Sequence, residues 1–600
     1  YAHEFINSPD RLTTPLIKKD GKFVEATWDE AYDLIAEKFA SYKPGETACL
    51  SSARVSNEEN YLMMKFARAV LKTPHIDHCA RLCHASTVAG LAASFGSGAM
   101  TNSILDIAEA RCLFVLGSNT FEQHPLIGRK IVQAKQNGAK IIYADPRYTP
   151  TARQADLYMP FVSGADVAIL NGLMQEIIKN GWEDREFIAG RTKDYEKLKE
   201  VVMEETYSLE NVSQISGIPV ESLKQAAEWL GTNKPGAILY SMGITQHTVG
   251  VDNVRSVANI QMLLGNLGRP GSGVNPLRDQ NNMQGACDMG ALPDVYSGYQ
   301  KVTDEAARKK FMDAWGVDIA EGEVGYTVTE LMNVLADNPG EIKGLYIMGE
   351  NPMLSCPDLH HVEKGLRNVE FMVVQDIFMT ETAERADIVL PAACYAEKDG
   401  TQTNTERRVQ RWRKAQEPPG EVKEDWQIIC ELGAKMGYAE QFAYKNPEEV
   451  FNEIAAVTPS YHGMSYERLD PDGLQWPCPT EEHPGTPILH RERFSNPDGL
   501  GIFAPIEWKP PAEVPDAEYP FVLTTGGVIW QWQTGTMTRR SWDLEREAPT
   551  GWIEINPEDA QALGIKNKEM VRASTRRGFV DVPAKVTPDI MKGVMFMPFH

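Results

Sequence analysis

The sequence has 600 residues, of which 42% are hydrophobic and 24% are charged, and its formal net charge at pH 7 is −23. This length predicts about three or four domains with large cores. No apolar run approaches the roughly 18 residues that cross a bilayer, so we expect no membrane span. The acidic balance also argues against a nucleic-acid partner.

Nine cysteines are scattered along the chain without a C-x-x-C pair. This pattern is typical of reduced thiols in a cytoplasmic protein, and we expect that location. The first residues, YAHEFINSPDRL, lack the basic and apolar segments of a signal peptide. Because the chain starts without methionine and stops directly after the apolar run GVMFMPF, we expect it to be truncated at both ends.

Helices and strands alternate along the first part of the chain. The capping box T-W-D-E at Thr27 predicts a helix whose apolar residues fall on one face. Further on, apolar runs predict strands at 48–50, 112–116 and 140–143, and a helical pattern occupies 126–136. This order is typical of a doubly wound parallel α/β sheet.

An internal repeat is the clearest sign of domain organisation. Residues 145–160 (DPRYTPTARQADLYMP) and 376–391 (DIFMTETAERADIVLP) are identical at seven of sixteen positions. A Gly-polar-Asn turn precedes each copy, at Gly117 and Gly349. We therefore predict two pseudo-repeated α/β domains. Polar residues that end parallel strands usually face ligands, although a duplicated scaffold without a ligand remains an alternative.

The repeat lacks the glycine patterns of dinucleotide-binding and P-loop folds. An Asp at a strand end, such as Asp145 or Asp376, can accept hydrogen bonds from the N1 and N2 hydrogens of guanine. A Gly-Asn turn that enters a helix suits a pyrophosphate. The two copies therefore predict two guanine nucleotides.

Beyond Asp470 the sequence becomes proline-rich and then forms short alternating strands. The proline-rich part, PDGLQWPCPTEEHPGTP followed by EWKPPAEVPDAEYP, is typical of a connection between domains. The later segments FVLTTG, GWIEI, EMVRAST, GFVDVPAKVT and GVMFMP predict a C-terminal β-barrel.

Five potential metal ligands lie close together, at His75, His78, Cys79, Cys83 and His84. A zinc site would need a second ligand pair at a usual spacing, and an iron–sulfur cluster would need about four cysteines. This stretch offers neither. Buried thiols with hydrogen-bonded histidines are the simplest alternative. A third hypothesis is a single thiolate, from Cys83, on a redox-active metal that a cofactor otherwise holds.

In that hypothesis a neighbouring group moves a proton and a cation holds the substrate. His84, with an ordinary pKa of about 6.5, is the candidate proton acceptor. Arg278 is the candidate cation, in the loop GVNPLRDQNNMQGACDMGALPD, whose many Asn, Gln and Gly residues favour a cofactor-facing segment. The alternative is an ordinary surface arginine paired with Asp279.

These stretches carry a family resemblance. RLCHASTVAGL, MGITQ, the loop around Arg278, VVQDIFMTETAERADIVLP and TGTMTRR resemble the catalytic subunit of molybdenum- or tungsten-dependent formate dehydrogenase, in the dimethyl sulfoxide reductase superfamily. The resemblance covers essentially all 600 residues. It implies two molybdopterin guanine dinucleotides that hold the metal, in agreement with the two guanine sites predicted from the repeat.

The resemblance also implies roles for individual residues. Cys83 takes the place of the protein ligand to the metal, His84 that of the active-site histidine, and Arg278 that of the arginine that binds formate. The positions that match the first nucleotide site are Asn119, Glu122, Asp145, Arg147, Gly164 and Asp166. Those that match the second are Glu350, Asn351, Ser355, Gln375, Asp376 and Asp425. Further cofactor-facing positions are Met242, Gln246 and Gln280, and a C-terminal cap that includes Gln533, Thr534 and Thr538.

From these features we expect four domains. One α/β domain, formed by residues 5–78 together with 281–395, binds the second guanine dinucleotide. Another, at 79–280, binds the first and carries the catalytic cysteine. A connecting domain spans 396–500, and an incomplete barrel at 515–600 caps the cofactor. The family's [4Fe-4S] cluster is also expected, but its cysteine ligands are absent from this chain as given.

The function that the resemblance implies is the reversible two-electron oxidation of formate to carbon dioxide. Electrons would pass to a β subunit with iron–sulfur clusters and a flavin, deazaflavin or NAD unit, within a larger electron-transfer complex. Two alternatives remain open. One is an assimilatory-type nitrate reductase, which shares the cofactor and the cysteine ligand. The other is a non-catalytic electron-transfer scaffold whose metal has been lost.

Overall fold

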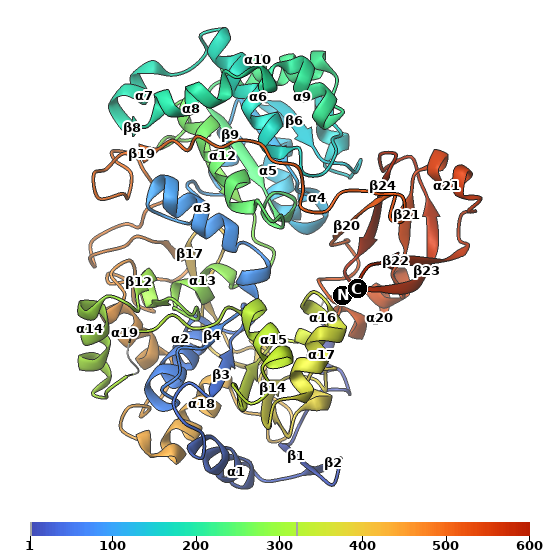
Figure 1. Ribbon diagram of the computed structural model, residues 1–600. Helices are drawn as coiled ribbons and strands as arrows, with labels where there is room; N and C mark the ends of the chain where they lie inside the picture. Colours follow the sequence, from blue (N-terminus) through green and yellow to red (C-terminus); the bar gives the residue numbers. More distant parts are fainter. Residues whose placement is uncertain (1–2, 320–321) are drawn as a thin grey trace. The chain divides into compact units, whose positions relative to one another are not determined.

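The computed structural model (Figure 1) describes residues 3–319 and 322–600. The described chain divides into two compact units. Unit 1 comprises residues 83–279 and 487–600, and unit 2 comprises residues 3–82 and 280–486. The chain therefore passes between the units after Leu82, after Asp279 and after Thr486.

The centre of unit 1 is a parallel sheet of five strands. Its order is β10 (Gly273–Pro276), β9 (Gly236–Tyr240), β5 (Cys112–Leu116), β6 (Lys140–Ala144) and β7 (Leu157–Met159). Phe114 enters a core shared with α3 (Ala85–Phe95), α6 (Asp166–Lys179) and α12 (Gly250–Leu263). Val115 enters a second core, shared with α5 (Pro125–Gln136). Uninterrupted apolar strands such as CLFVL are typical of a sheet that is covered on both faces.

The centre of unit 2 is a mixed sheet of seven strands. Five run parallel, in the order β15 (Ile388–Pro391), β14 (Phe371–Asp376), β13 (Gly344–Met348), β3 (Thr47–Leu50) and β4 (Ile76–Asp77). The hairpin of β1 (Leu16–Lys19) and β2 (Lys22–Glu25) adds an antiparallel edge beside β15. One face packs on α15 (Val328–Asp337) and α17 (Leu359–Arg367).

Both copies of the internal repeat span the same kinds of element. The first runs from the end of β6 through a 3-10 turn (Ala152–Gln154) to β7. The second runs from the end of β14 through a 3-10 turn (Ala383–Arg385) to β15. In each copy the two strands are parallel neighbours. The predicted α/β class with parallel sheets is therefore confirmed.

The elements predicted from local sequence patterns agree with the structure. Helix α1 (Trp28–Ala40) begins after Thr27, and the capping box that Thr27 forms with Glu30 is present. The strands predicted at 48–50, 112–116 and 140–143 are β3, β5 and β6. The helix predicted at 126–136 is α5.

Unit 2 continues after the repeat with a small antiparallel sheet and two helices. The sheet consists of β16 (Gly400–Thr403), β17 (Arg408–Trp412) and β18 (Leu474–Gln475), and the helices are α18 (Asp425–Gly433) and α19 (Pro447–Val457). Among the described residues, no helix combines the length and the apolar character that a bilayer crossing requires.

The last five strands of unit 1 form one mixed sheet. Their order is β20 (Val522–Gly526), β24 (Val594–Pro598), β21 (Ile553–Ile555), β23 (Gly578–Val586) and β22 (Met570–Thr575). In the described part of the chain, no pairing joins the edge strands β20 and β22, so the sheet is open. The predicted C-terminal barrel is therefore not confirmed.

Asp288, at the end of α13 (Met283–Asp288), is a buried centre of hydrogen bonding in unit 2. Its carboxylate accepts hydrogen bonds of 2.6–2.9 Å from Gln284, Tyr299, Tyr461 and Trp476. All four partners are donors. Asp288 thereby ties the later part of the Arg278 loop to the region around β18.

We expect Asp288→Asn to lower the free energy of unfolding by about 3 kcal/mol, because an amide NH2 would meet donors in a buried site. Urea denaturation followed by tryptophan fluorescence measures the change. In the control Asp313→Asn, on an exposed face of α14 (Glu305–Trp315), the change should stay below about 0.5 kcal/mol. Equal effects of the two substitutions would contradict the role of Asp288.

Candidate active site and nucleotide-binding cavity

Cys83 lies between a 3-10 turn (Cys79–Leu82) and α3. The residue is only 9% exposed, and its Sγ lies 3.4 Å from Met242 Sδ. The Cys83 carbonyl accepts a hydrogen bond of 3.0 Å from Thr245 Oγ1, so its backbone is fixed against α11 (Met242–Thr245). The predicted metal ligand and the predicted pterin-facing methionine thus lie side by side.

His84 is buried and hydrogen-bonded through both ring nitrogens. Nε2 lies 3.1 Å from the Leu277 carbonyl oxygen, and Nδ1 lies 3.1 Å from Thr87 Oγ1, which in turn bonds Tyr240. Because a carbonyl oxygen only accepts, Nε2 carries the hydrogen and Nδ1 accepts. Burial, with the nearby charge of Arg278, lowers the pKa of His84 to about 3. The ring is therefore neutral in this structure, and the role of His84 as a proton acceptor stays a prediction.

Arg278 follows β10 and is 4% exposed. Its Nη2 donates to the Gly98 carbonyl oxygen at 3.3 Å. The neighbouring carboxylate, Asp279, lies 2.8 Å from His124 Nε2 through its Oδ1. Arg278 is thus a buried residue and not a surface arginine, and the partner that Asp279 takes is His124.

Asp279 and His124 form a buried acid–base pair that the sequence did not reveal. Burial raises the pKa of Asp279, but its contact with His124, together with a hydrogen bond from Gln533, holds that pKa below its ordinary value. The sequence signals were weak, since His124 merely follows the Gly-polar-Asn turn and Asp279 merely follows Arg278. The acidic member of the pair, Asp279, directly follows the predicted substrate-binding arginine in the sequence.

The remaining members of the five-residue metal-ligand stretch point to different partners in unit 2. His75 stacks on Tyr326, with ring centroids 4.5 Å apart, and its Nδ1 accepts from the Tyr326 amide. His78 Nε2 lies 3.6 Å from Cys287 Sγ. Cys79 Sγ donates to Gln280 Oε1 at 3.0 Å. Within residues 3–319 and 322–600, no three His, Cys, Asp or Glu side chains are arranged to hold a metal ion by themselves.

A cavity of about 590 Å³ opens in unit 1 at the carboxyl ends of the parallel strands. One wall comes from the turns that follow β5 and β6 and from α11, and the other comes from the C-terminal sheet, through β20 and Phe596. Six predicted cofactor-binding residues line it: Asn119, Asp145, Arg147, Asp166, Met242 and Gln246. The fold thus gathers most of the first predicted nucleotide site around one cavity.

Asp166 is the carboxylate in this cavity that is best placed to bind a ligand. It begins α6 and is 1% exposed, and among the described residues neither of its carboxylate oxygens accepts a hydrogen bond from another side chain, although the backbone amides of Gly164 and Asp166 lie close enough to lower its pKa. Asp145 Oδ1, by contrast, accepts from the Arg147 amide at 2.9 Å. Burial raises the pKa of Asp145 to about 6. Burial also raises the pKa of Asp166, and the nearby His247 partly offsets that second rise. Asp166 therefore offers two acceptors to a ligand with paired N–H donors.

The other predicted residues of this site have structural partners. Arg147 donates from Nε and Nη2 to Glu554 Oε2 at 3.1 and 3.0 Å, which ties the turn after β6 to β21. Glu122 accepts from Asn119 Nδ2 at 2.5 Å. Gly164 has a φ of +90°, and a Cβ there would lie 2.2 Å from Pro511 Cγ. These residues shape the cavity and its walls.

The second predicted nucleotide site gathers at the ends of β13 and β14 in unit 2. Glu350 Oε1 accepts from the Cys79 amide at 2.6 Å, and burial raises the pKa of Glu350 to about 8. Asp376 Oδ1 accepts from the Ile377 amide, and burial raises its pKa to about 6. The remaining members also form hydrogen bonds with one another. Ser355 Oγ donates to the Asn351 carbonyl oxygen, and Gln375 Nε2 donates to Asp425 Oδ1.

The predicted C-terminal cap lies in unit 1 between β20 and β21. Thr538 Oγ1 donates to Gln531 Oε1 at 2.6 Å and accepts from the Trp532 amide at 3.1 Å, so this segment folds on itself. Gln533 has a φ of +54° and interacts with Asp279. Thr534 lies 3.5 Å from Thr536, hydroxyl to hydroxyl. The cap thus reaches the segment that carries Arg278.

Comparison with known proteins identifies relatives along the whole chain. Residues 11–435 match the family model described as molybdopterin oxidoreductase, and residues 521–600 match that of the molydopterin dinucleotide binding domain. The F420-dependent formate dehydrogenase 1 subunit alpha of Methanococcus maripaludis is 54% identical over 600 residues, which are 100% of this chain and 88% of that protein.

Two further similarities are informative. Formate dehydrogenase H of Escherichia coli is 40% identical over 615 residues, covering 100% of this chain and 85% of that protein. Among solved structures, acetylene hydratase from Pelobacter acetylenicus matches with a TM-score of 0.78 over 100% of this chain and 86% of that chain. At 22% identity, this last similarity shows a shared fold.

Two glycines let the turn after β5 approach α11 at the edge of the cavity. A Cβ on Gly243 would lie 2.6 Å from the Gly117 Cα, and backbone atoms cannot move aside as a flexible side chain can. We expect Gly243→Ala to lower the free energy of unfolding by about 1–3 kcal/mol, measured by urea denaturation.

A matched control is Gly190→Ala on α7 (Arg185–Arg191), where a Cβ meets nothing within 4 Å. Alanine there should leave the stability unchanged or raise it by up to about 1 kcal/mol. If Gly243→Ala is as well tolerated as this control, the close backbone approach does not constrain the cavity.

Proposed function

We propose a specific activity for this chain, which belongs to the molybdopterin oxidoreductase family. It is the catalytic subunit of a formate dehydrogenase, which oxidises formate to carbon dioxide and can run in reverse. The observation that supports the proposal is the 3.1 Å hydrogen bond between His84 Nε2 and the Leu277 carbonyl oxygen in unit 1, which joins the neighbour of Cys83 to the neighbour of Arg278. Both curated relatives described above are named as formate dehydrogenases.

Arg278 would bind the substrate. Formate is a planar carboxylate, and the planar guanidinium can donate two parallel hydrogen bonds to it, which fixes the direction of the C–H bond. The low exposure of Arg278, 4%, excludes water and strengthens this attraction. In the overall reaction formate loses its C–H bond and gives carbon dioxide, one proton and two electrons.

His84 and Cys83 would complete the site. His84 is held neutral, with its ring fixed by Leu277 and Thr87, so it offers a fixed dipole beside the substrate and carries no second positive charge. The Cys83 thiol is the group that would ligate the metal, since a soft thiolate suits molybdenum or tungsten.

The chain's residues fit the implied cofactor, two molybdopterin guanine dinucleotides with molybdenum or tungsten. Asp166, with two acceptor oxygens at a cavity of about 590 Å³, suits the paired N–H donors of a guanine. The turns at Asn119 and Asn351 would face the phosphates, with Met242, Gln246 and Gln280 toward the pterins. When bound, the metal and pterins supply the two-electron redox chemistry.

Electrons would leave through a partner, because the sequence offers no flavin or nicotinamide motif. Of the acceptors expected from the sequence, the name of the Methanococcus relative favours F420, a deazaflavin. We therefore propose a partner subunit with iron–sulfur clusters and a cytoplasmic location. The [4Fe-4S] cluster expected for the family would need four cysteine ligands that this sequence does not supply. The division into four domains stays a prediction.

Nitrate reductase is the nearest rival, because it shares the cofactor class and the cysteine ligand. A benzyl viologen assay with formate and with nitrate separates the two functions. Turnover of nitrate without formate oxidation would overturn the proposal. A non-catalytic scaffold predicts neither activity and no bound molybdenum or tungsten.

We expect Arg278→Lys to raise the KM for formate by about tenfold or more, because an ammonium cannot make the bidentate contact. The bound metal content should stay unchanged, and the benzyl viologen assay measures the KM. The control is Arg572→Lys on β22. It alters an exposed bidentate ion pair with Asp581 of β23 and should leave the KM unchanged. An unaltered KM in Arg278→Lys would contradict the role of Arg278.

A further inference from the structure

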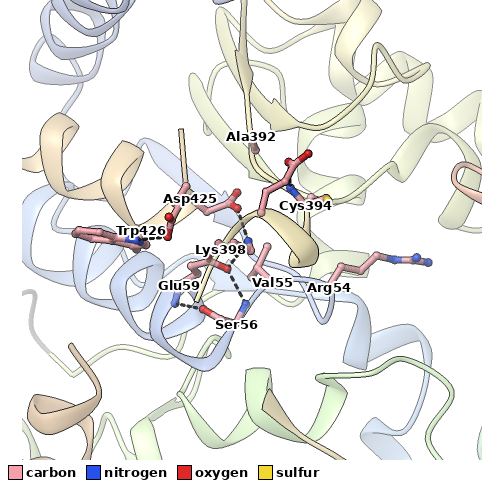
Figure 2. A network of polar contacts seen from close by, with 12 residues as sticks. Arg54, Val55, Ser56, Glu59, Ala392, Cys394, Lys398, Asp425 and Trp426 are labelled. Carbon is pink, nitrogen blue, oxygen red and sulfur yellow. Dashed lines mark hydrogen bonds and ion pairs between the residues drawn. The ribbon is translucent and has the colours of Figure 1, made fainter. Parts of the chain in front are cut away.

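Lys398 bridges two buried carboxylates in unit 2 (Figure 2). It follows the 3-10 turn Tyr395–Glu397 and precedes β16. Its Nζ lies 2.8 Å from Glu59 Oε2 and 2.5 Å from Asp425 Oδ2, and Figure 2 shows both carboxylates directed toward it. The three side chains are 2%, 0% and 4% exposed. All three charges are therefore removed from water.

The acidic members of this group are fixed by their helices. Glu59 belongs to α2 (Asn57–Lys65) and closes a capping box with Ser56, whose amide donates to Glu59 Oε2 at 2.7 Å. Asp425 is the first residue of α18, where the helix N-terminus favours a negative charge. Lys398 thus connects two helix N-termini that lie far apart in the sequence.

The ion pairs connect directly to the second predicted nucleotide site. Asp425 Oδ1 accepts from Gln375 Nε2 at 2.6 Å, and Gln375 Oε1 accepts from Tyr346 at 2.5 Å. Gln375 ends β14 beside Asp376. A carboxylate has about four acceptor positions, and Lys398 and Gln375 occupy one on each oxygen of Asp425. One position on each oxygen is left, as a guanine with adjacent N1–H and N2–H donors requires.

The first site provides a comparison. Asp166 is the first residue of α6, the first α-helix after β7. Asp425 is the first residue of α18, the first α-helix after β15. The two residues therefore hold equivalent places after their copies of the repeat. At the first site Asp166 raises the pKa of Asp145, and His247 opposes the rise at Asp166; at the second site Asp425 raises the pKa of Glu59. Burial raises the pKa of Glu59 to about 7, and Lys398 opposes that rise. Two like charges at the second site therefore need a cation.

We propose that Lys398 is a positioning residue for the second nucleotide: it orients Asp425 and keeps it an acceptor, so that the site selects guanine. This inference rests on the proposed function, in which Asp425 and Gln375 face that nucleotide. Without the ammonium, two neighbouring buried carboxylates would share a proton. A protonated Asp425 would present a donor to the donors of guanine, and its orientation would be lost.

The test uses the full chain without cofactor, in an Asp166→Asn background that removes the acceptor pair of the first site. Isothermal titration calorimetry compares GDP with IDP, which lacks the 2-amino group. We expect the Asp166→Asn chain to bind GDP about tenfold more tightly than IDP. This ratio corresponds to the loss of one hydrogen bond to a charged group. Adding Lys398→Met should bring the GDP to IDP ratio close to one, and Lys398→Arg should retain most of the preference.

Two controls separate selectivity from folding. Lys423→Met removes another lysine of unit 2, which pairs with Glu431 and packs over Trp28, and should leave the GDP to IDP ratio unchanged. If Lys398→Met fails to fold, Lys398→Met with Glu59→Gln removes the repulsion between the carboxylates. The GDP preference should still fall in this variant, because Asp425 loses the ammonium that orients it, but by less than in Lys398→Met, because Asp425 no longer shares a proton with Glu59.

A folded Lys398→Met chain that keeps the full GDP preference overturns the role of Lys398 and leaves the proposed function intact. If neither the wild-type chain nor the Asp166→Asn chain prefers GDP to IDP, the guanine sites of the proposed function fail, and the inference fails with them.

Discussion

The hydrogen bond between His84 Nε2 and the Leu277 carbonyl oxygen, 3.1 Å long, joins the two segments on which the candidate active site depends. Both segments lie next to crossings of the chain between its units, since Cys83 is the first residue after one crossing and Asp279 the last before another. Within unit 1, Thr245 fixes the Cys83 carbonyl in the same region. Residues distant in sequence thereby form one site that is shielded from water.

Buried carboxylates at the carboxyl edges of parallel sheets recur in both units. Helix N-termini and strand-end amides converge there, which favours anions and their ligands. Burial nevertheless raises the pKa of Asp145 and Asp376, each to about 6. The two halves of the repeat differ in how their buried carboxylates are held. Asp166 keeps two acceptors available at a cavity, whereas Asp425 is held by Lys398 and Gln375.

Local patterns predicted the helices, the parallel strands and the repeated order of elements, because apolar periodicity and capping residues act over a few positions. The pairing of Asp279 with His124 could not be predicted that way, because the two residues meet only after the sheet has formed. The neutral state of His84 and the ion pairs of Lys398 depend on burial for the same reason. The roles of Cys83, His84 and Arg278 came from the resemblance to a family. The predicted barrel is an open sheet in the described residues, since strand alternation does not specify whether edges pair.

The most direct test of the Cys83 ligand is X-ray absorption at the metal edge of the purified holoenzyme. If the Cys83 thiolate binds the metal, Cys83→Ala should lose one sulfur neighbour from the metal's first coordination shell. Cys79→Ala, which removes the thiol four residues earlier, should leave that shell unchanged. An identical sulfur shell in the wild type and in Cys83→Ala would contradict metal binding by Cys83 and, with it, the proposed site.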